Sequence, residues 1–258
     1  MANIITLMTD FGSQDGYVGA MMGRLLRLSP HHRIVEITHD IEPQNVWQAA
    51  FSLQRYAQEY PDNTVHMVVV DPGVGSERKA LALRCDRHWL VGPDNGVLSL
   101  AASRYKNVES YQLKSQTEWW KKHTSFDGLA LFSPAAACLL NPEIRLEELA
   151  SPIDGYHNLA FPPAEFIGNK LIGQILSFDR FGNAITNITS ADIPKNPLLT
   201  VDCNKYQFPI RPFYCEANAN NRIAIINSDG YLELAIYQGS VKAELALSIG
   251  DSVFVDPE

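Results

Sequence analysis

Several features that would place a protein in a specialised class are scarce or missing from this sequence. Its cysteines lie far apart and include no CxxC pair, so neither a disulfide framework nor a zinc site is predicted. We expect buried free thiols, as in proteins of the reducing cytoplasm. The four cysteines are Cys85, Cys138, Cys203 and Cys215.

Long apolar runs are also missing. No stretch approaches the roughly 20 apolar residues that a membrane-spanning helix needs. The first residues, MANIITLMTDFG, contain no basic segment and reach Asp10 too early for a signal peptide. The sequence therefore predicts a cytoplasmic protein that has no membrane partner.

Basic residues are in the minority, with 21 Lys and Arg against 29 Asp and Glu, and the formal net charge is −8. No dense Lys/Arg stripe appears, so nucleic acid is not an expected partner. The GxxxxGK[ST], GxSxG and HExxH motifs are absent, and GVG at 73–75 lacks the third glycine of a dinucleotide fingerprint. The seven histidines show no ligand spacing. We predict neither a bound metal nor a cofactor.

What the sequence does contain is the alternation of an α/β protein. Short apolar runs, such as 3–11 and 64–71, alternate with helically spaced segments, such as 17–30 and 45–60. This pattern predicts an N-terminal α/β domain with a mostly parallel sheet over residues 1–155. Ligands of open α/β sheets bind beyond the carboxyl ends of the strands. The polar residues at those predicted ends are Asp10, His39, Asp40, Asp71, Asp94 and Asn95.

The composition and periodicity of the sequence change after this domain. Residues 151–170 are rich in Pro and Gly without a clear period, which indicates an interdomain connection. Short strand-like runs separated by turns follow, and helical signal is sparse apart from SVKAELAL. We predict a small C-terminal β-barrel domain over residues 165–258.

One turn carries an unusual combination of residues. In VVVDPGVGSERKALAL, an apolar strand runs into Asp71, and Arg78 follows after a Pro-Gly turn. A carboxylate at the edge of a core is unfavourable unless it is paired or has a task. The residues alone allow either a structural ion pair across a hairpin or a functional pair at the mouth of a pocket.

Six segments, in this order, resemble the S-adenosylmethionine (SAM) hydroxide adenosyltransferases, relatives of the SAM-dependent fluorinases and chlorinases. The resemblance covers nearly the whole chain. The segments are TDFGSQDGYVGAMMG, ITHDIEPQNVWQAAF, VVVDPGVGSERKALAL, VGPDNGVLS, FDRFGNAITNI and NSDGYLELAIYQGS.

The resemblance implies a homotrimer in which SAM lies between the N-terminal domain of one subunit and the C-terminal domain of its neighbour. SAM is the substrate, and no cofactor is implied. The reaction is nucleophilic substitution at the ribose C5′, in which water or hydroxide attacks and methionine leaves. The products are adenosine and L-methionine.

The resemblance also implies roles for individual residues. Asp71 and Arg78 match two members of the family's Asp-Arg-His catalytic set. Such a pair can orient a water molecule and hold a developing hydroxide. Asp10 matches the acid that grips the ribose diol, although it also fits an N-cap or turn aspartate. Asn95 is equally well explained by turn chemistry alone.

The predicted C-terminal domain supplies further binding residues by the same resemblance. Asp179 matches the group that meets the methionine ammonium, and Ser228 the group that meets the methionine carboxylate. Phe181 and Asn183 match the adenine side, where an aromatic face and an amide suit a purine. Tyr214 matches an aromatic near the base but is as well explained as a core tyrosine.

One segment departs from the family pattern. The family usually has Thr-Phe-His-Gly-Arg-Asp where this chain has Ser125, Phe126, Asp127, Gly128, Leu129 and Ala130. Phe126 and Gly128 are kept as predicted binding residues, whereas the histidine is Asp127 and the Arg-Asp pair is Leu129-Ala130.

Three hypotheses follow from this departure. Asp127 acts as a base beside Asp71, in a pair of carboxylates of which one keeps its proton to higher pH. Alternatively, nearby His123 replaces the lost imidazole, or the pocket binds SAM with slow or no turnover. The function predicted first is SAM hydrolysis. The alternatives are a SAM- or adenosine-binding protein with a degenerate site and, below it, a SAM-dependent halogenase, because a second carboxylate repels halide.

Overall fold

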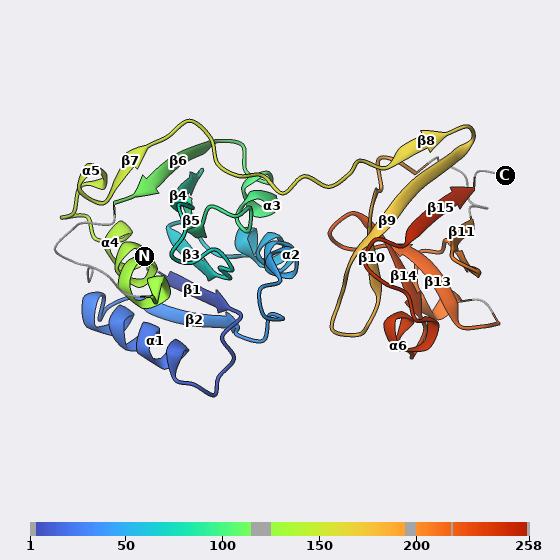
Figure 1. The fold of residues 1–258 in the computed structure, drawn as a ribbon, viewed down its shortest axis with the longest axis horizontal. Coiled ribbons are helices and arrows are strands. Elements are labelled where there is room, and N and C mark those ends of the chain that lie inside the picture. The colour runs from blue at the N-terminus through green and yellow to red at the C-terminus, as the bar shows by residue number, and fades with distance from the viewer. Residues whose placement is uncertain (1–3, 115–124, 194–199, 218, 257–258) are drawn as a thin grey trace. The chain divides into compact units, whose positions relative to one another are not determined.

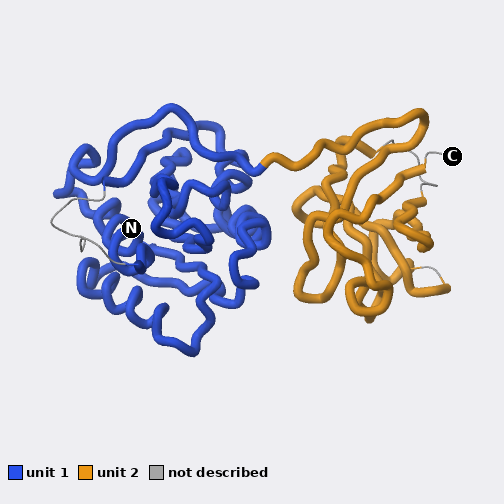
Figure 2. The backbone as a smooth tube through the Cα atoms, in the orientation of Figure 1, with its two compact units in different colours: residues 1–159 blue, residues 160–258 orange. Residues whose placement is uncertain are grey.

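The computed structural model describes residues 4–114, 125–193, 200–217 and 219–256. The chain divides into two compact units, residues 1–159 and 160–258 (Figure 2). The first is an α/β unit built on one sheet, and the second is a barrel-like β unit (Figure 1). The predicted fold class is confirmed.

The sheet of the first unit has seven strands, of which five run in the same direction. Parallel pairing joins β2 to β1, β1 to β3, and β3 to β5. β4 is antiparallel to both β5 and β6, so β6 returns to the common direction, and β7 opposes it. The spatial order is β2 (Arg33–Thr38), β1 (Ile4–Thr9), β3 (Thr64–Val69), β5 (His88–Pro93), β4 (Ala80–Cys85), β6 (Val108–Leu113) and β7 (Ala150–Pro152).

Helices cover both faces of this sheet. All six residues of β1 and all six of β3 are buried, as expected for central parallel strands with helices on either side. α1 (Tyr17–Leu28) packs with α4 (Ser133–Leu139) over one face, and α2 (Val46–Tyr56) packs with α3 (Ser99–Ala102) over the other. The remaining helical segments are η1 (Ala57–Glu59), η2 (Gly128–Phe132) and α5 (Leu146–Leu149).

The second unit is a nearly closed barrel. The main path is β12 (Tyr206–Pro209), β11 (Thr200–Cys203), β15 (Ser252–Asp256), β9 (Lys170–Phe178), β10 (Ala184–Thr189), β14 (Tyr231–Ile236) and β13 (Arg222–Ile226). β8 (Glu165–Ile167) pairs with β9, and two short helical segments, η3 (Tyr214–Glu216) and α6 (Val241–Leu245), lie outside the sheet. The first and last strands approach each other at a bridge between Ile210 and Ala224. Arg211 N–H donates to Ala224 O at 3.0 Å, which continues this closure.

Some elements carry too little apolar pattern to be predicted. β6 reads VESYQL, and among its six residues only Leu113 is fully buried. The predicted connection at 151–170 contains the end of β7 and all of β8, both three-residue strands with mostly exposed side chains. Short edge strands of this kind bury few side chains, so hydrophobic periodicity does not mark them.

All four cysteines are free thiols, and three of them are buried. The expectation of buried thiols is wrong for Cys215, which is exposed within η3. A short irregular segment at the edge of a barrel offers no second layer to cover its side chains.

A buried imidazole pair lies inside the first unit. His66 on β3 and His88 on β5 stack with ring centroids 5.4 Å apart, and their Nε2 and Nδ1 atoms are 3.2 Å apart. Thr6 Oγ1 lies 2.9 Å from Nδ1 of His66, so both ring nitrogens of His66 have partners. Burial, with the neighbouring His88 adding to it, lowers the pKa of His66 to about 3.

Acid should therefore destabilise this unit before its carboxylates are protonated. An unfolded histidine takes up its proton near pH 6.5, whereas folded His66 resists it until about pH 3, so stability falls as pH falls through this window. The expected loss from pH 7.5 to pH 5 is about 2 kcal/mol from this group, measured by urea unfolding at both pH values. His66→Gln should flatten the pH dependence, and His31→Gln at an exposed position should not. An equal pH dependence in all three proteins would contradict this assignment.

Candidate active site

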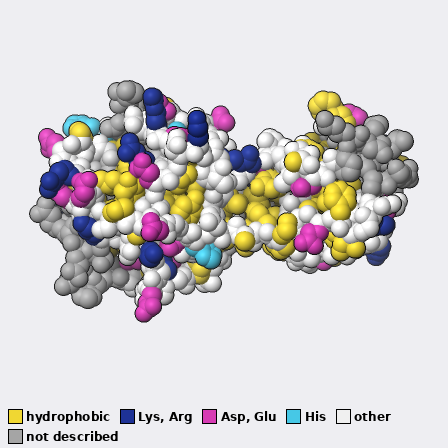
Figure 3. All heavy atoms as spheres, turned by 90° about the horizontal axis from the view of Figure 1, so that it is seen from above, with side chains coloured by type: hydrophobic (Ala, Val, Ile, Leu, Met, Phe, Trp, Pro, Cys, Tyr) yellow, Lys and Arg dark blue, Asp and Glu magenta, His cyan; other side chains and the backbone are white. Residues whose placement is uncertain are grey.

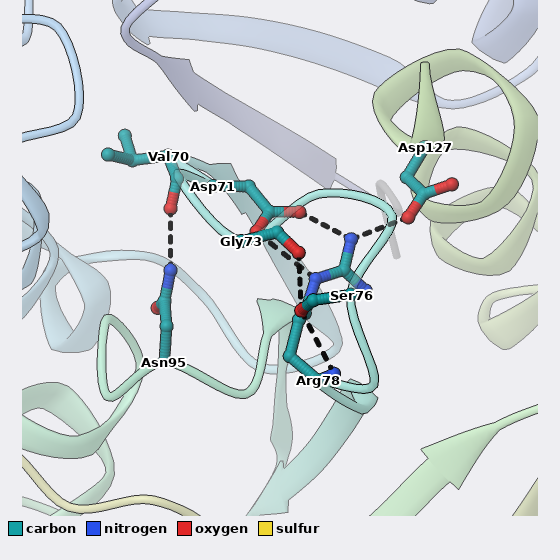
Figure 4. Close-up of polar contacts among 7 residues, drawn as sticks. All are labelled: Val70, Asp71, Gly73, Ser76, Arg78, Asn95 and Asp127. Carbon is teal, nitrogen blue, oxygen red and sulfur yellow. Dashed lines mark hydrogen bonds and ion pairs between the residues drawn. The ribbon is translucent and has the colours of Figure 1, made fainter. Parts of the chain in front are cut away.

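The candidate site lies at the carboxyl ends of the central strands β1, β3 and β5. Asp10 directly follows β1, Asp71 follows β3, and Asn95 follows β5. The Asn95 side chain donates from Nδ2 to Val70 O at 2.9 Å and accepts from Val97 N–H at 3.1 Å (Figure 4). Both ends of this amide therefore hold backbone in place, which matches its turn-chemistry interpretation.

The turn after β3 folds Arg78 back onto Asp71. Val74 N–H donates to Asp71 O, and Ser76 N–H donates to Gly73 O at 3.1 Å. The Ser76 hydroxyl donates to the same Gly73 carbonyl at 2.7 Å and accepts from Arg78 N–H. Gly75 has φ of 81°, a left-handed conformation that glycine adopts without strain. The Pro-Gly turn is thus what brings an arginine seven residues away to the strand end.

Asp71 and Arg78 form a two-pronged, largely buried ion pair. Arg78 Nε donates to Asp71 Oδ1 at 3.1 Å, and Arg78 Nη2 donates to Asp71 Oδ2. The Asp71 side chain is only 5% exposed, and that of Arg78 is 12% exposed. Two parallel hydrogen bonds of this kind fix both the position and the orientation of the carboxylate.

Asp127, from a distant part of the chain, binds the same guanidinium group of Arg78. Arg78 Nη2 also donates to Asp127 Oδ2, at 2.5 Å, so one nitrogen bridges two carboxylates (Figure 4). The Asp127 side chain is 24% exposed, more than either partner. Sequence position alone, 49 residues from Arg78, does not reveal this contact.

A helical turn with widened spacing presents Asp127. The π-helical segment η2 begins immediately after Asp127 and leads into α4, and the Ser133 hydroxyl donates to Gly128 O at 2.6 Å. A side chain at Gly128 would come within 2.8 Å of the Phe126 ring and 3.0 Å of Met21 Sδ. Turns of this type occur frequently at functional sites, because they redirect side chains at the cost of regular hydrogen bonding.

The positive charge of Arg78 stays fixed across the ordinary pH range. Burial by itself lowers the pKa of Arg78, but hydrogen bonds and charge attraction from Asp71 and then Asp127 outweigh it and raise the pKa. The Phe132 ring centroid lies 5.5 Å from the guanidinium carbon, which adds a cation–π contact. One permanent cation therefore faces two carboxyl groups.

A cavity of about 230 Å³ opens onto these carboxylates. Three aromatic rings, of Phe11, Tyr17 and Phe126, form part of its wall, with centroids 5.2 to 5.9 Å apart in pairs. Its other lining residues are Val69, Asp71, Val74, Ser125, Asp127 and Gly128. A small cavity with apolar walls and two carboxylates can hold a few atoms away from bulk water and orient them.

The predicted residues Phe126, Asp127 and Gly128 thus meet Asp71 at one cavity, whereas Asp10 lies beside it and outside its lining. Asp10 Oδ2 accepts from Gln44 N–H at 2.7 Å, and Asp10 remains partly exposed. Phe11 and Tyr17 line the cavity but were not predicted as site residues. The signal available in the sequence was their place inside the same TDFGSQDGY segment.

The departures from the family pattern have simple structural outcomes. Leu129 packs against the hydrophobic core, and Ala130 is buried in η2, so both are absorbed as apolar packing. His123 lies outside the described residues.

The second unit has a separate groove of about 710 Å³, lined by Phe181, Asn183 and Tyr214 among others. Phe181 is 77% exposed, so its ring is available to a ligand. Tyr214 donates its hydroxyl to Glu233 Oε1 at 2.7 Å, and its ring lines the groove, so it is not a core tyrosine. Groove residues that were not predicted come from the end of β14, the YQGS segment and α6: Ile236, Tyr237, Gln238, Gly239, Ser240 and Glu244.

Asp179 and Ser228 are not among the residues that line this groove. Asp179 Oδ1 accepts from the N–H groups of Phe181 and Asn183, each at 2.9 Å, and Oδ2 accepts from Asn183 Nδ2 at 3.2 Å. It therefore shapes the loop that presents Phe181 and Asn183. Ser228 is exposed in the turn between β13 and β14.

Among the described residues, no group of three or more His, Cys, Asp or Glu side chains is arranged to hold a metal ion. Nor does this part of the chain contain a helix that is long and apolar enough to cross a membrane.

Comparison with known families matches both units. Residues 5–150 match the SAM hydroxide adenosyltransferase N-terminal domain, and residues 173–254 match the C-terminal domain. A protein named (R)-S-adenosyl-L-methionine hydrolase from Thermus thermophilus is 31% identical, over 95% of this chain and 96% of its own. One of the same name from Methanocaldococcus jannaschii is 30% identical over 97% and 95%.

Two further similarities extend this comparison. A fluorinase from Actinoplanes sp. is 24% identical over 95% of this chain and 97% of its own. Among solved structures, an uncharacterized conserved protein from Thermotoga maritima is similar with a TM-score of 0.85 and 30% identity, covering 98% of this chain and all of its own. The similarity therefore spans both units and the loops that carry the candidate site.

Proposed function

This chain belongs to the SAM hydroxide adenosyltransferase family, and from that membership we propose that it is an enzyme that hydrolyses SAM to adenosine and L-methionine. The observation that carries the proposal is the cluster of Asp71, Arg78 and Asp127 at the wall of a small cavity.

The proposed reaction is a single displacement at the ribose C5′. A water oxygen forms a bond to C5′ while the bond from C5′ to the sulfonium sulfur breaks, and its electron pair goes to sulfur. The water gives up one proton, so the products are adenosine, methionine and H⁺. Sulfonium is already a good leaving group, and the enzyme's task is to orient water in line with the C5′–S bond.

Each charged residue has a part in that task. Asp71, which is fixed by two hydrogen bonds from Arg78, orients the water and accepts its proton. Arg78 stabilises the negative charge that develops on the attacking oxygen. Asp127 shares the guanidinium and supplies a second acceptor at the more exposed side of the cluster.

We assign SAM recognition to groups in both units. Asp10 takes the ribose hydroxyls, since its carboxylate has acceptor capacity beyond the bond from Gln44. Phe126 and Gly128 form the wall next to the reacting carbon. Adenine is assigned to the groove with Phe181, Asn183 and Tyr214, and the methionine groups to Asp179 and Ser228.

A SAM- or adenosine-binding protein with little turnover is the second candidate, because Asp127 stands where the family usually has histidine. Halogenation ranks below both, because two carboxylates against one guanidinium leave the cavity with a net negative charge that disfavours halide. Incubation with SAM separates the three. Hydrolysis releases adenosine and methionine in equal amounts, binding alone releases neither, and halogenation requires added halide and gives a 5′-halogenated nucleoside.

We also propose a cytoplasmic homotrimer in which each SAM site uses residues of two subunits. The second unit exposes several large apolar side chains, including Phe166, Ile167, Phe181 and Phe213, and apolar side chains also gather on the face drawn in Figure 3. Light scattering after gel filtration should give three times the chain mass of 28.8 kDa. A monomer that binds SAM tightly would contradict the shared site.

A further inference from the structure

His39 lies at the carboxyl end of β2, next to the turn that carries Asp10, and the proposed reaction gives it no part. Its Nδ1 lies 2.8 Å from the Thr9 hydroxyl oxygen, and its backbone carbonyl accepts from Gly12 N–H at 2.9 Å. The Glu36 carboxylate lies 3.2 Å from Nε2, within ion-pairing distance but outside hydrogen-bond alignment. One residue thus contacts both sides of the Asp10 turn.

The direction of these hydrogen bonds follows from the neighbouring groups. Phe11 N–H donates to Thr9 Oγ1 at 3.3 Å, which leaves the Thr9 hydroxyl hydrogen for another acceptor. Burial lowers the pKa of His39, although Glu36 and Asp40 oppose the shift, so the imidazole is neutral at pH 7. We assign the hydrogen of the neutral ring to Nε2, because the nearby Glu36 carboxylate favours it there, and Nδ1 is then the acceptor for the Thr9 hydroxyl.

The order hydroxyl, imidazole and carboxylate resembles a nucleophilic triad, but the burial of Thr9 excludes that use. Thr9 is 0% exposed, and its hydroxyl already accepts the Phe11 amide. What the chain of contacts can do is hold the backbone of residues 10–12. The connection between β2 and α2, which contains His39, also supplies Gln44, whose N–H donates to the Asp10 carboxylate at 2.7 Å.

We propose that His39 is a positioning residue, which through Thr9 and its own carbonyl fixes the Asp10–Gly12 turn in the orientation that binds substrate. The inference rests on the proposed function, because Asp10 is assigned to the ribose hydroxyls. It predicts a larger effect on substrate binding than on the chemical step, since Asp10 is assigned to the ribose hydroxyls and does not line the cavity at Asp71, which the turn reaches through Phe11.

Two matched pairs of variants test the proposal. Thr9→Val removes the hydroxyl at nearly constant shape, and Thr9→Ser keeps it. His39→Leu removes the acceptor, and His39→Asn keeps one near the position of Nδ1. Thr9→Val and His39→Leu should raise KM for SAM about ten-fold, the scale of one lost buried hydrogen bond, with kcat changed less than about three-fold. Thr9→Ser and His39→Asn should keep the KM for SAM close to the wild-type value.

Amide hydrogen exchange of the ligand-free protein gives a readout that needs no turnover. The Phe11 and Gly12 amides should exchange about ten-fold faster in Thr9→Val and His39→Leu than in the wild type, with β3 amides unchanged. Unchanged exchange at Phe11 and Gly12 would overturn the positioning role. The same conclusion would follow if all four variants showed the same fall in kcat and the same rise in KM. A wild type that binds no SAM would overturn the proposed function instead, and exchange would still decide the role of His39.

Discussion

Replacing Asp71 by Asn is expected to reduce the rate of adenosine release at least about 10³-fold while SAM still binds. Asn keeps the shape of the side chain but cannot accept a proton from water. Its amide also cannot accept two hydrogen bonds from Arg78 as the carboxylate does. The measurement is kcat from adenosine release, with SAM affinity measured separately by calorimetry.

The control for this variant is a second aspartate that pairs with arginine but lies at the surface. Asp62 pairs with Arg87 at 2.5 Å, and both side chains are well exposed. Exposed pairs of this kind contribute little to stability because water and salt screen them, so Asp62→Asn should leave both kcat and folding nearly unchanged. If Asp71→Asn kept wild-type turnover, the buried pair would be a structural ion pair across the hairpin.

The second large effect is expected at Asp127. Asp127→Ala should reduce kcat about 10²-fold, the usual contribution of a positioned acid or base. Asp127→His should restore or raise the rate, because a neutral imidazole takes a proton from water more readily than a carboxylate. Adenosine release against pH is to be measured for the wild type and both variants.

The structure adds a constraint to this experiment. Asp127 reaches Arg78 from the residue before η2, and Leu129 and Ala130 in that turn are apolar and packed. An imidazole placed there still lies beside Arg78, whose positive charge favours its neutral form. Equal rates for the wild type and Asp127→Ala at every pH would remove Asp127 from the mechanism. A nearly inactive wild type that gains activity in Asp127→His would favour the degenerate-site alternative.

Much of the fold could be predicted because its central elements bury continuous apolar runs. β1 and β3 are buried at every position, and their helices show clear periodicity. The elements that were missed, such as β6 and β8, have mostly half-exposed or exposed side chains that follow no apolar pattern, and β8 is also an edge strand. Edge strands form because a neighbouring strand offers unpaired hydrogen-bonding groups, which local sequence does not record.

The candidate site could be predicted where a motif is local and not where it depends on tertiary contact. The Asp71–Arg78 pair arises from one short turn and could be predicted from the sequence of that turn. The bridge from Arg78 to Asp127 and the aromatic wall from Phe11 and Tyr17 depend on how loops from separate strands meet. For Asp179 the family resemblance implied a ligand contact, whereas its carboxylate accepts hydrogen bonds within its own loop.

The most direct test of the account is to incubate the protein with SAM in ¹⁸O-labelled water and analyse the products by mass spectrometry. Displacement at C5′ by water predicts adenosine that carries one ¹⁸O atom, formed in equal amount with unlabelled methionine, and no halogenated nucleoside when chloride is added. SAM that stays intact while bound, or a halide-dependent product, would contradict the proposal that the cluster at Asp71 and Arg78 directs water to C5′.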